Sequence, residues 1–136
     1  MNRIVQNNKD KLFVNYFPNK GKETVILLHG GPGFPSDMDE VREMLKTNYQ
    51  VISFHQRGTK LSPCESKDYS MQAYVSDIEC IASAFELDKF HLWGHSWGGL
   101  YAQIYADKYR EKLISLFLCC PGSGTGKEWL ETEKEV

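Results

Sequence analysis

The stretch at residues 93–99 is WGHSWGG, which places Ser96 between Gly94 and Gly98. An apolar run precedes it and a helical pattern follows it. A serine on so sharp a turn from strand to helix adopts strained backbone angles, and its flanking positions must be small so that strand and helix can pass closely. The pattern predicts a nucleophile elbow with Ser96 as the nucleophile. An ordinary glycine-rich turn between a strand and a helix is the alternative.

Apolar runs and helical patterns alternate on both sides of this motif. Alternating runs at 3–6 and 12–17, separated by a turn-rich segment, predict an antiparallel hairpin. Strands are expected at 24–28, 50–54, 90–93 and 113–120, and helices at about 36–46, 70–85 and 98–109, with Ser36 or Asp37 capping the first helix. Alternation of strand and helix from residue 24 onward predicts a parallel sheet covered by helices on both faces.

Reactive groups gather at the carboxyl ends of the strands in such sheets. His29, His55, Ser96 and Pro121 all lie at or just beyond these predicted ends. The elbow puts the amide of Trp97 at the positive end of a helix, where it can stabilise an oxyanion. The glycines of the loop at 29–33 let the backbone approach a ligand closely, and we expect the amide of Gly31 to be the second donor. A tight loop without a catalytic amide is the alternative.

Three motifs in this order carry a family resemblance. HGGPG at 29–33, QRG at 56–58 and GHSWGG at 94–99 resemble the amino-terminal part of an α/β-hydrolase of the proline iminopeptidase-like group, from about residue 12 to about 125. The resemblance implies an α/β-hydrolase fold, with a mostly parallel sheet, an antiparallel N-terminal hairpin and an incomplete C-terminus. It implies Ser96 as nucleophile, the amides of Gly31 and Trp97 as oxyanion donors, and hydrolysis of amide or ester bonds through an acyl-enzyme without metal or cofactor. Related members remove an amino-terminal residue, often proline, from short peptides.

The sequence departs from this family pattern in two places. The family usually has aspartate where His55 stands before Gln56, so we expect His55 to be a structural or substrate-lining replacement, with a role as substitute base as the alternative. The family's acid and base follow the nucleophile on later strands. Only a loop and a polar helical segment follow the strand at 113–120. We therefore expect residues 1–126 to be the N-terminal part of a hydrolase core and residues 127–136 the start of a cap helix.

The remaining histidines and acids do not complete a triad. His95 adjoins Ser96 on a strained turn and should point away from it, His29 should bond within its loop, and His91 should face a helix or solvent. In the family's strand order, two strand spacings of about 9.6 Å separate His55 from the elbow strand. The acidic candidates Asp37, Asp39 and Asp68 are plausible helix-cap or loop carboxylates. The chain alone should be inactive, and a non-catalytic truncated hydrolase that acts as a binding or interaction module is the alternative.

Composition limits the partners and the compartment. The 136 residues are 41% hydrophobic and 25% charged with a net charge of −2, which indicates a globular domain without a basic surface for nucleic acid. No apolar run reaches the roughly 20 residues that span a bilayer, and no secretory signal is evident, so we expect a soluble cytoplasmic protein. The four cysteines, at 64, 80, 119 and 120, match no zinc pattern and should be free thiols.

The expected partners follow from the same features. We expect a small peptide or ester as substrate, and neither nucleic acid nor membrane as a partner. The strand at 113–120 should leave an unpaired sheet edge, which favours self-association or pairing with a missing C-terminal half.

Overall fold

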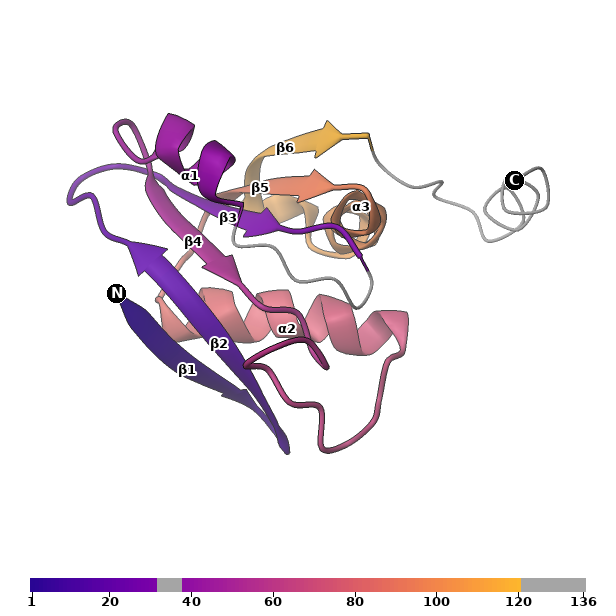
Figure 1. The fold of residues 1–136 in the computed structure, drawn as a ribbon. Helices are drawn as coiled ribbons and strands as arrows, with labels where there is room; N and C mark the ends of the chain where they lie inside the picture. Colours follow the sequence, from indigo (N-terminus) through magenta and orange to yellow (C-terminus); the bar gives the residue numbers. More distant parts are fainter. Residues whose placement is uncertain (32–37, 121–136) are drawn as a thin grey trace.

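A computed structural model of the protein describes residues 1–31 and 38–120 (Figure 1). The described strands form one sheet in the order β1-β2-β4-β3-β5-β6. The strands are β1 (Asn2–Asn7), β2 (Asp10–Phe17), β3 (Thr24–Leu28), β4 (Gln50–Phe54), β5 (Phe90–His95) and β6 (Leu113–Cys119). The helices are α1 (Asp39–Leu45), α2 (Met71–Ala84) and α3 (Trp97–Lys108), with a short 3-10 turn at Arg110–Lys112.

The sheet is mixed, with a parallel part that carries the elbow. Strands β4, β3, β5 and β6 are parallel, whereas β1 pairs with β2 and β2 pairs with β4 in the antiparallel sense. In the centre, Ile26 pairs with Ile52 on one side and with Leu92 on the other. The predicted parallel sheet with an antiparallel N-terminal hairpin is confirmed.

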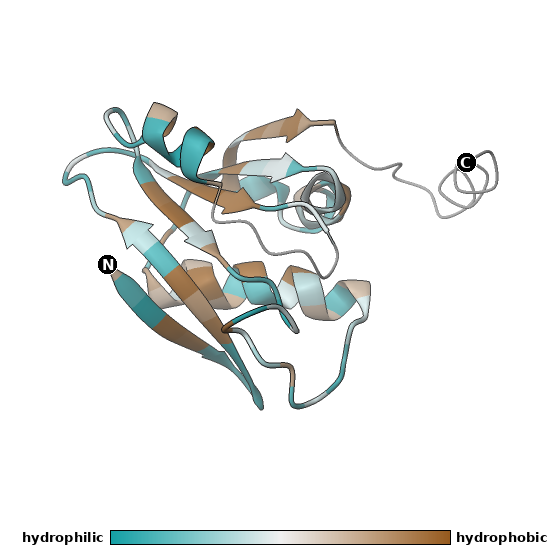
Figure 2. Ribbon diagram, viewed as in Figure 1, coloured by the Kyte–Doolittle hydropathy of each residue, from teal (hydrophilic) through white to brown (hydrophobic). Residues whose placement is uncertain are grey.

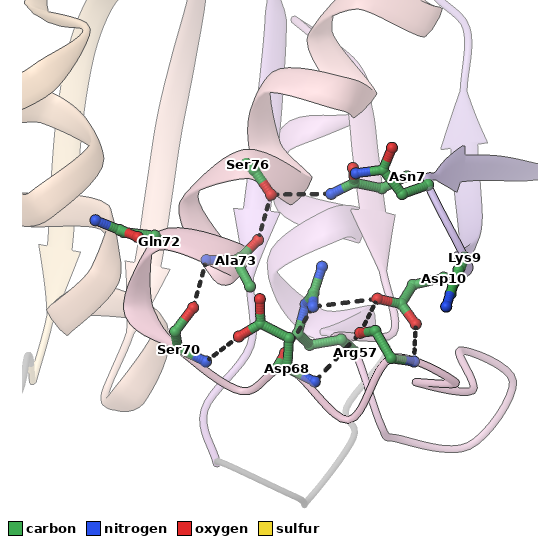
Figure 3. Close-up of a pocket in the computed structure, with 11 residues that line it drawn as sticks. Asn7, Lys9, Asp10, Arg57, Asp68, Ser70, Gln72, Ala73 and Ser76 are labelled. Carbon is green, nitrogen blue, oxygen red and sulfur yellow. Dashed lines mark hydrogen bonds and ion pairs between the residues drawn. The ribbon is translucent and has the colours of Figure 1, made fainter.

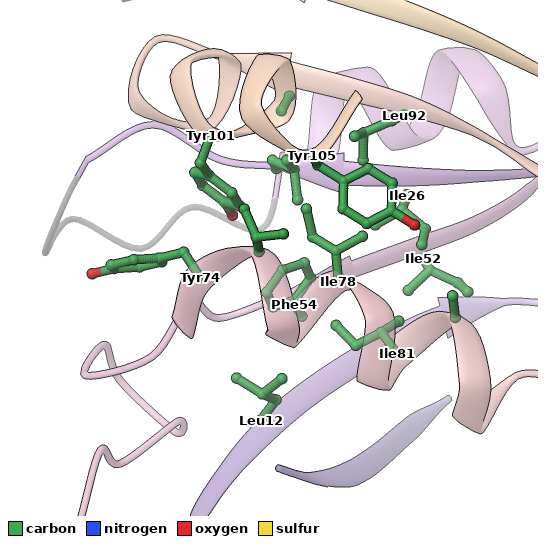
Figure 4. Packing of buried hydrophobic residues seen from close by; sticks show 14 of the residues in the cluster. Leu12, Ile26, Ile52, Phe54, Tyr74, Ile78, Ile81, Leu92, Tyr101 and Tyr105 are labelled. Carbon is green, nitrogen blue, oxygen red and sulfur yellow. The ribbon is translucent and has the colours of Figure 1, made fainter. Parts of the chain in front are cut away.

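Helices cover both faces of the sheet. Successive side chains of a strand point to opposite faces, so β3 sends Ile26 and Leu28 into a large cluster beneath α2 and α3 (Figure 4). Val25 and Leu27 point the other way, into a smaller cluster that packs against α1. β3 is therefore apolar from Val25 to Leu28, and Figure 2 shows this strand in brown.

The start of α1 differs from the prediction. The helix begins at Asp39, and its N-cap position is Met38, in a left-handed conformation with φ 53° and no side-chain cap. Ser36 and Asp37, the predicted cap residues, lie outside the described part of the chain. The acidic residues Asp39 and Glu40 occupy the first turn instead, where negative charge is favourable to the helix dipole.

Helix α2 has the side-chain cap that its sequence indicates. Ser70 occupies the N-cap position, and its hydroxyl accepts a hydrogen bond of 3.2 Å from the amide of Ala73. The same amide also donates to the carbonyl oxygen of Ser70 at 3.0 Å, so Ser70 provides both acceptors of this first-turn N–H.

Replacing Ser70 with alanine should lower the free energy of unfolding by about 1 kcal/mol, because the amide of Ala73 then loses its side-chain acceptor and keeps only the carbonyl oxygen of residue 70. Urea denaturation followed by circular dichroism measures the change. Ser83→Ala is the matched control, since Ser83 is exposed near the end of the same helix. An equal loss in both variants would contradict the capping role.

Candidate active site

The predicted elbow is the connection between β5 and α3. β5 runs on to His95 and α3 starts at Trp97, so Ser96 alone links them. Its backbone has φ 52° and ψ −115°, a combination that residues with side chains rarely adopt. Strain at a single non-glycine residue between strand and helix is the local geometry that a nucleophile elbow requires.

The glycines on either side of Ser96 are required by close backbone contacts. A methyl group on Gly94 would come within 2.7 Å of the carbonyl oxygen of Gly98. A methyl group on Gly98 would collide with the carbonyl oxygens of Leu28 and His29 at the end of β3. Helix α3 therefore begins in direct backbone contact with both neighbouring strands, which fixes the position of Ser96 above the sheet.

Backbone hydrogen bonds hold Ser96 on both sides. Its amide donates to the carbonyl oxygen of Cys119 at 3.1 Å, and its own carbonyl accepts from the amide of Leu100 at 3.2 Å. The side chain is half-buried. The amide of Trp97 belongs to the first residue of α3 and so has no acceptor within the helix. This amide lies next to Ser96 at the start of the helix.

The loop after β3 approaches Ser96 from the neighbouring strand. A methyl group on Gly30 would lie 3.5 Å from Cβ of Ser96, so the loop backbone is in contact distance of the nucleophile. Gly31 has φ 144°, which a residue with a side chain rarely adopts. Pro32 and Gly33, the rest of this motif, lie outside the described residues. The structure thus brings the segment of Gly31 to the elbow, as the sequence predicts.

His29 ties this loop to the loop that follows β4. Its Nδ1–H donates to the carbonyl oxygen of Gly30 at 2.6 Å, and its Nε2 accepts from the amide of Gln56 at 3.1 Å. The side-chain amide of Gln56 in turn donates to the carbonyl oxygen of His29 at 2.7 Å. The predicted structural role of His29 is confirmed, and the partner Gln56 is a residue that the sequence analysis missed.

His55 lies on the side of β4 away from the elbow. The residue is 4% exposed, and its ring packs against Phe13 of β2 with centroids 5.2 Å apart. In the sheet, β2 lies beside β4, whereas the elbow strand β5 lies beyond β3 on the other side of β4. This placement favours the structural reading of His55 over a role as base for Ser96.

The last two histidines are also not bonded to the nucleophile. Nε2–H of His91 donates to the carboxylate of Glu23 at 3.0 Å, and its Nδ1 lies 2.6 Å from the hydroxyl of Ser115. His95 is exposed at the end of β5. Within residues 1–31 and 38–120, no side chain forms a hydrogen bond with the hydroxyl of Ser96. The described residues therefore place Ser96 on a strained elbow, and the hydrogen bonds among them give its hydroxyl no basic partner.

An ion-pair network braces the loop that follows His55 and Gln56 (Figure 3). Arg57 donates two hydrogen bonds to the carboxylate of Asp77 on α2, at 2.7 and 2.8 Å, and one to Asp10 at 3.3 Å. All three side chains are at most 5% exposed. A fourth bond, 2.6 Å long, runs from Arg57 to the carbonyl oxygen of Asp68. Sequence reasoning missed this network because its members lie far apart along the chain and form no recognisable motif.

The network shifts the pKa values of Arg57 and Asp10. Burial alone would lower the pKa of Arg57, but the hydrogen bonds and charge of Asp77 outweigh it and raise that pKa. Burial would raise the pKa of Asp10, yet hydrogen bonds from Ser66 and the charge of Arg57 bring it below its usual range. Both groups are therefore charged at neutral pH and stabilise each other.

The structure has one hollow beside the elbow and another beside the Arg57 network. A hollow of about 500 Å³ is lined by residues of β5, β6 and α1, which include Trp93, His95 and Cys119. Burial and the neighbouring Cys120 raise the pKa of the Cys119 thiol, so it is protonated at neutral pH. The other hollow, of about 470 Å³, surrounds Arg57 (Figure 3), and Ser96 is not among the described lining residues of either hollow.

Other kinds of site have no support in the described part of the chain. Across residues 1–31 and 38–120, no group of three or more histidine, cysteine or acidic side chains could hold a metal ion. No helix in these ranges is long and apolar enough to cross a membrane. The cysteines at 64, 80, 119 and 120 are free thiols, as predicted.

Comparison with known proteins gives the same assignment as the site. Residues 23–136 match the family described as alpha/beta hydrolase fold. The proline iminopeptidase of Clostridioides difficile is 30% identical over 118 residues, which cover 85% of this chain and 40% of the relative. The proline iminopeptidase of Chitinophaga pinensis is 35% identical over 84 residues, which cover 57% of this chain and 28% of the relative.

A solved structure supports the fold. The crystal structure of proline iminopeptidase from Mycobacterium smegmatis superposes with a TM-score of 0.86 at 22% identity, covering 99% of this chain and 48% of that one. The chain thus spans less than half the length of the proteins it matches. The family match over residues 23–136 and the similarity to these relatives show that the chain belongs to the alpha/beta hydrolase fold family and is proline iminopeptidase-like.

Proposed function

We propose that the protein is the nucleophile-bearing part of a serine hydrolase that cleaves amide or ester bonds through an acyl-enzyme. The observation that carries the proposal is the strained backbone of Ser96, with φ 52° and ψ −115°, between β5 and the start of α3. Such strain persists only where the surrounding structure imposes it, and it clusters at reactive residues. Here the contacts of Gly94 and Gly98 impose it.

The proposed chemistry begins with attack of the Ser96 hydroxyl oxygen on a carbonyl carbon. The hydroxyl proton passes to a general base, and the carbonyl oxygen becomes an oxyanion held by the amides of Trp97 and Gly31. Collapse of this intermediate expels the amine or alcohol, which takes the proton, and leaves an ester on Ser96. Water activated by the same base then releases the acid and restores the serine.

The base and the acid belong, in this proposal, to residues other than those described. The ring nitrogens of His29 and His91 form hydrogen bonds elsewhere in the fold, and the ring of His55 packs toward β2. The relatives are more than twice as long as the stretch they share with this chain. We therefore propose that the 136-residue chain by itself is inactive and that its serine acts once a base is supplied.

The proposed substrate class comes from the relatives. Both curated relatives described above are named proline iminopeptidase, so we propose an aminopeptidase-like activity on the amino-terminal residue of short peptides. A binding role without catalysis is favoured by one separate observation, the exposure of the apolar side chains of Ile114 and Phe117 on β6.

Imidazole added to the solution should substitute for the absent base. The substrate is p-nitrophenyl acetate, and the measured quantity is the rate of nitrophenol release by the natural chain minus the rate by Ser96→Ala. This difference should grow at least about tenfold as imidazole is added, because a general base accelerates attack by the serine. Stopped-flow absorbance measures both rates.

Ser115→Ala is the matched control, since Ser115 is an exposed serine on β6 and should leave the difference intact. Equal rates for the natural chain and Ser96→Ala at every imidazole concentration would refute Ser96 as nucleophile. A large Ser96-dependent rate without imidazole would show that the chain contains its own base.

A further inference from the structure

Gln56 holds His29 both by its backbone and by its side chain. Its backbone N–H donates to Nε2 of the His29 ring at 3.1 Å, and its side-chain amide donates to the carbonyl oxygen of the same residue at 2.7 Å. Both residues are 1% exposed, so water does not compete for these bonds. The loop after β4 is therefore joined to the end of β3 at two points of a single histidine.

The contacts of the His29 ring determine which of its nitrogens carries the proton. A backbone N–H can only donate, so Nε2 of His29 is the acceptor of this bond and carries no proton. The proton of the neutral ring is then on Nδ1, which donates to the carbonyl oxygen of Gly30 at 2.6 Å. Because a carbonyl oxygen can only accept, both contacts require the same tautomer.

The bond from His29 to Gly30 sets the direction of the N–H of Gly31. The carbonyl of Gly30 and the N–H of Gly31 belong to one planar peptide group, and in a trans peptide the two point in opposite directions. With the carbonyl bound to the His29 ring, the N–H points away from that ring. The same peptide borders the elbow, since a methyl group on Gly30 would lie 3.5 Å from Cβ of Ser96.

The loop after β4 is itself anchored, which keeps Gln56 in place. The carbonyl oxygen of Gln56 accepts from the backbone N–H of Thr59 at 3.0 Å and from its hydroxyl at 2.7 Å. The next residue, Arg57, is bound to the buried carboxylate of Asp77 on α2. The backbone N–H that faces His29 therefore belongs to a turn that is held on both sides.

We propose that Gln56 is a positioning residue for the oxyanion hole: it holds His29 in the Nδ1–H tautomer and thereby directs the N–H of Gly31 toward the oxyanion. Gln56 touches no reacting atom and acts through His29. This role rests on the proposed function, in which the amide of Gly31 is one of two oxyanion donors. A misdirected N–H lowers the rate, because a hydrogen bond to the oxyanion weakens steeply when donor and acceptor are not aligned.

The rate test compares Gln56→Met with Gln50→Met. The side-chain amide of Gln50 donates to the hydroxyl of Thr24 at 3.0 Å, so it also joins β4 to β3, but at the opposite end of the two strands. Gln56→Met should lower the Ser96-dependent rate of nitrophenol release in imidazole at least about tenfold, a part of the loss caused by removing an oxyanion donor. Gln50→Met should leave that rate unchanged. Equal rates in the two variants would overturn the proposal, whereas a natural chain with no Ser96-dependent rate would overturn the proposed function instead.

Nuclear magnetic resonance gives a second readout that needs no catalysis. Nitrogen spectra of the natural chain should show His29 as the Nδ1–H tautomer, and the residual dipolar coupling of the Gly31 N–H measures the direction of that bond. In Gln56→Met both tautomers should be populated and the coupling should fall, whereas Gln50→Met should retain both signals. A purely structural clamp would lower the melting temperature of Gln56→Met but leave the ring spectrum and the coupling unchanged, and that result would overturn the proposal.

Gln56→Asn is the second variant should Gln56→Met prove unfolded by circular dichroism. Its side chain keeps the amide but is one methylene shorter, so it cannot reach the carbonyl oxygen of His29 from the same backbone position. The same losses of rate and of coupling are expected. Should neither variant fold, the ring spectrum of the natural chain decides: the Nδ1–H tautomer of His29 supports the proposal, and the Nε2–H tautomer overturns it.

Discussion

Replacing Arg57 with methionine should lower the free energy of unfolding by about 3 to 5 kcal/mol, the loss expected when one partner of a buried ion pair is removed. The substitution leaves the carboxylates of Asp77 and Asp10 buried, at 1% and 5% exposure, without their cation. Methionine retains most of the apolar stem, so the loss reports the charge and the hydrogen bonds rather than packing. Urea denaturation followed by tryptophan fluorescence and circular dichroism measures it.

Arg42→Met is the matched control for this prediction. Arg42 also pairs with two carboxylates, but Asp39 and Glu43 are 65% and 53% exposed. Exposed ion pairs contribute about 0 to 1 kcal/mol, so the control should lose no more than that. Equal losses in the two variants would mean that the network around Arg57 does not brace the loop between β4 and α2.

Replacing Gly98 with alanine should destabilise the fold by about 3 kcal/mol, the upper end of the range for overpacking, and should also abolish the imidazole-dependent reaction of Ser96. The added methyl group would collide with the carbonyl oxygens of Leu28 and His29, which are backbone atoms of β3 and its loop. The start of α3 must then move away from β3, and the amide of Trp97 moves with it.

Gly21→Ala separates this collision from the general effect of removing a glycine. Gly21 has φ 82° but nothing within 4 Å of an added methyl group, so only conformational strain of about 1 to 2 kcal/mol is expected. The reaction of Ser96 should remain as in the natural chain. A Gly98→Ala variant that matches Gly21→Ala in both stability and reactivity would show that the close approach of α3 to β3 is unnecessary.

The strands could be predicted from the sequence because their signal is local. The fully buried run at Thr24–Leu28 and the run at Gln50–Phe54 have the bounds that their apolar residues indicate. β5 extends two residues beyond the prediction, to His95, because Gly94 and His95 pair with Leu118 and Cys119 of β6. Such pairing partners are distant in sequence, so a local pattern cannot reveal where the strand ends.

The candidate site likewise has one part that local sequence predicts and another that it does not. The elbow and the glycines beside it follow from local spacing, since Gly94, Ser96 and Gly98 lie within one turn. The contacts that hold the surrounding loops, His29 with Gln56 and Arg57 with Asp77, join residues 20 or more positions apart. They depend on how the strands are ordered in the sheet, which residue spacing does not specify.

The most direct test of Ser96 as nucleophile is the mass-spectrometric mapping of a fluorophosphonate adduct. With imidazole present, the probe should form one covalent adduct on the 136-residue chain, located on the peptide that contains Ser96, and Ser96→Ala should acquire none. An adduct located on another residue, or one that forms equally in Ser96→Ala, would contradict the assignment of Ser96 as the nucleophile.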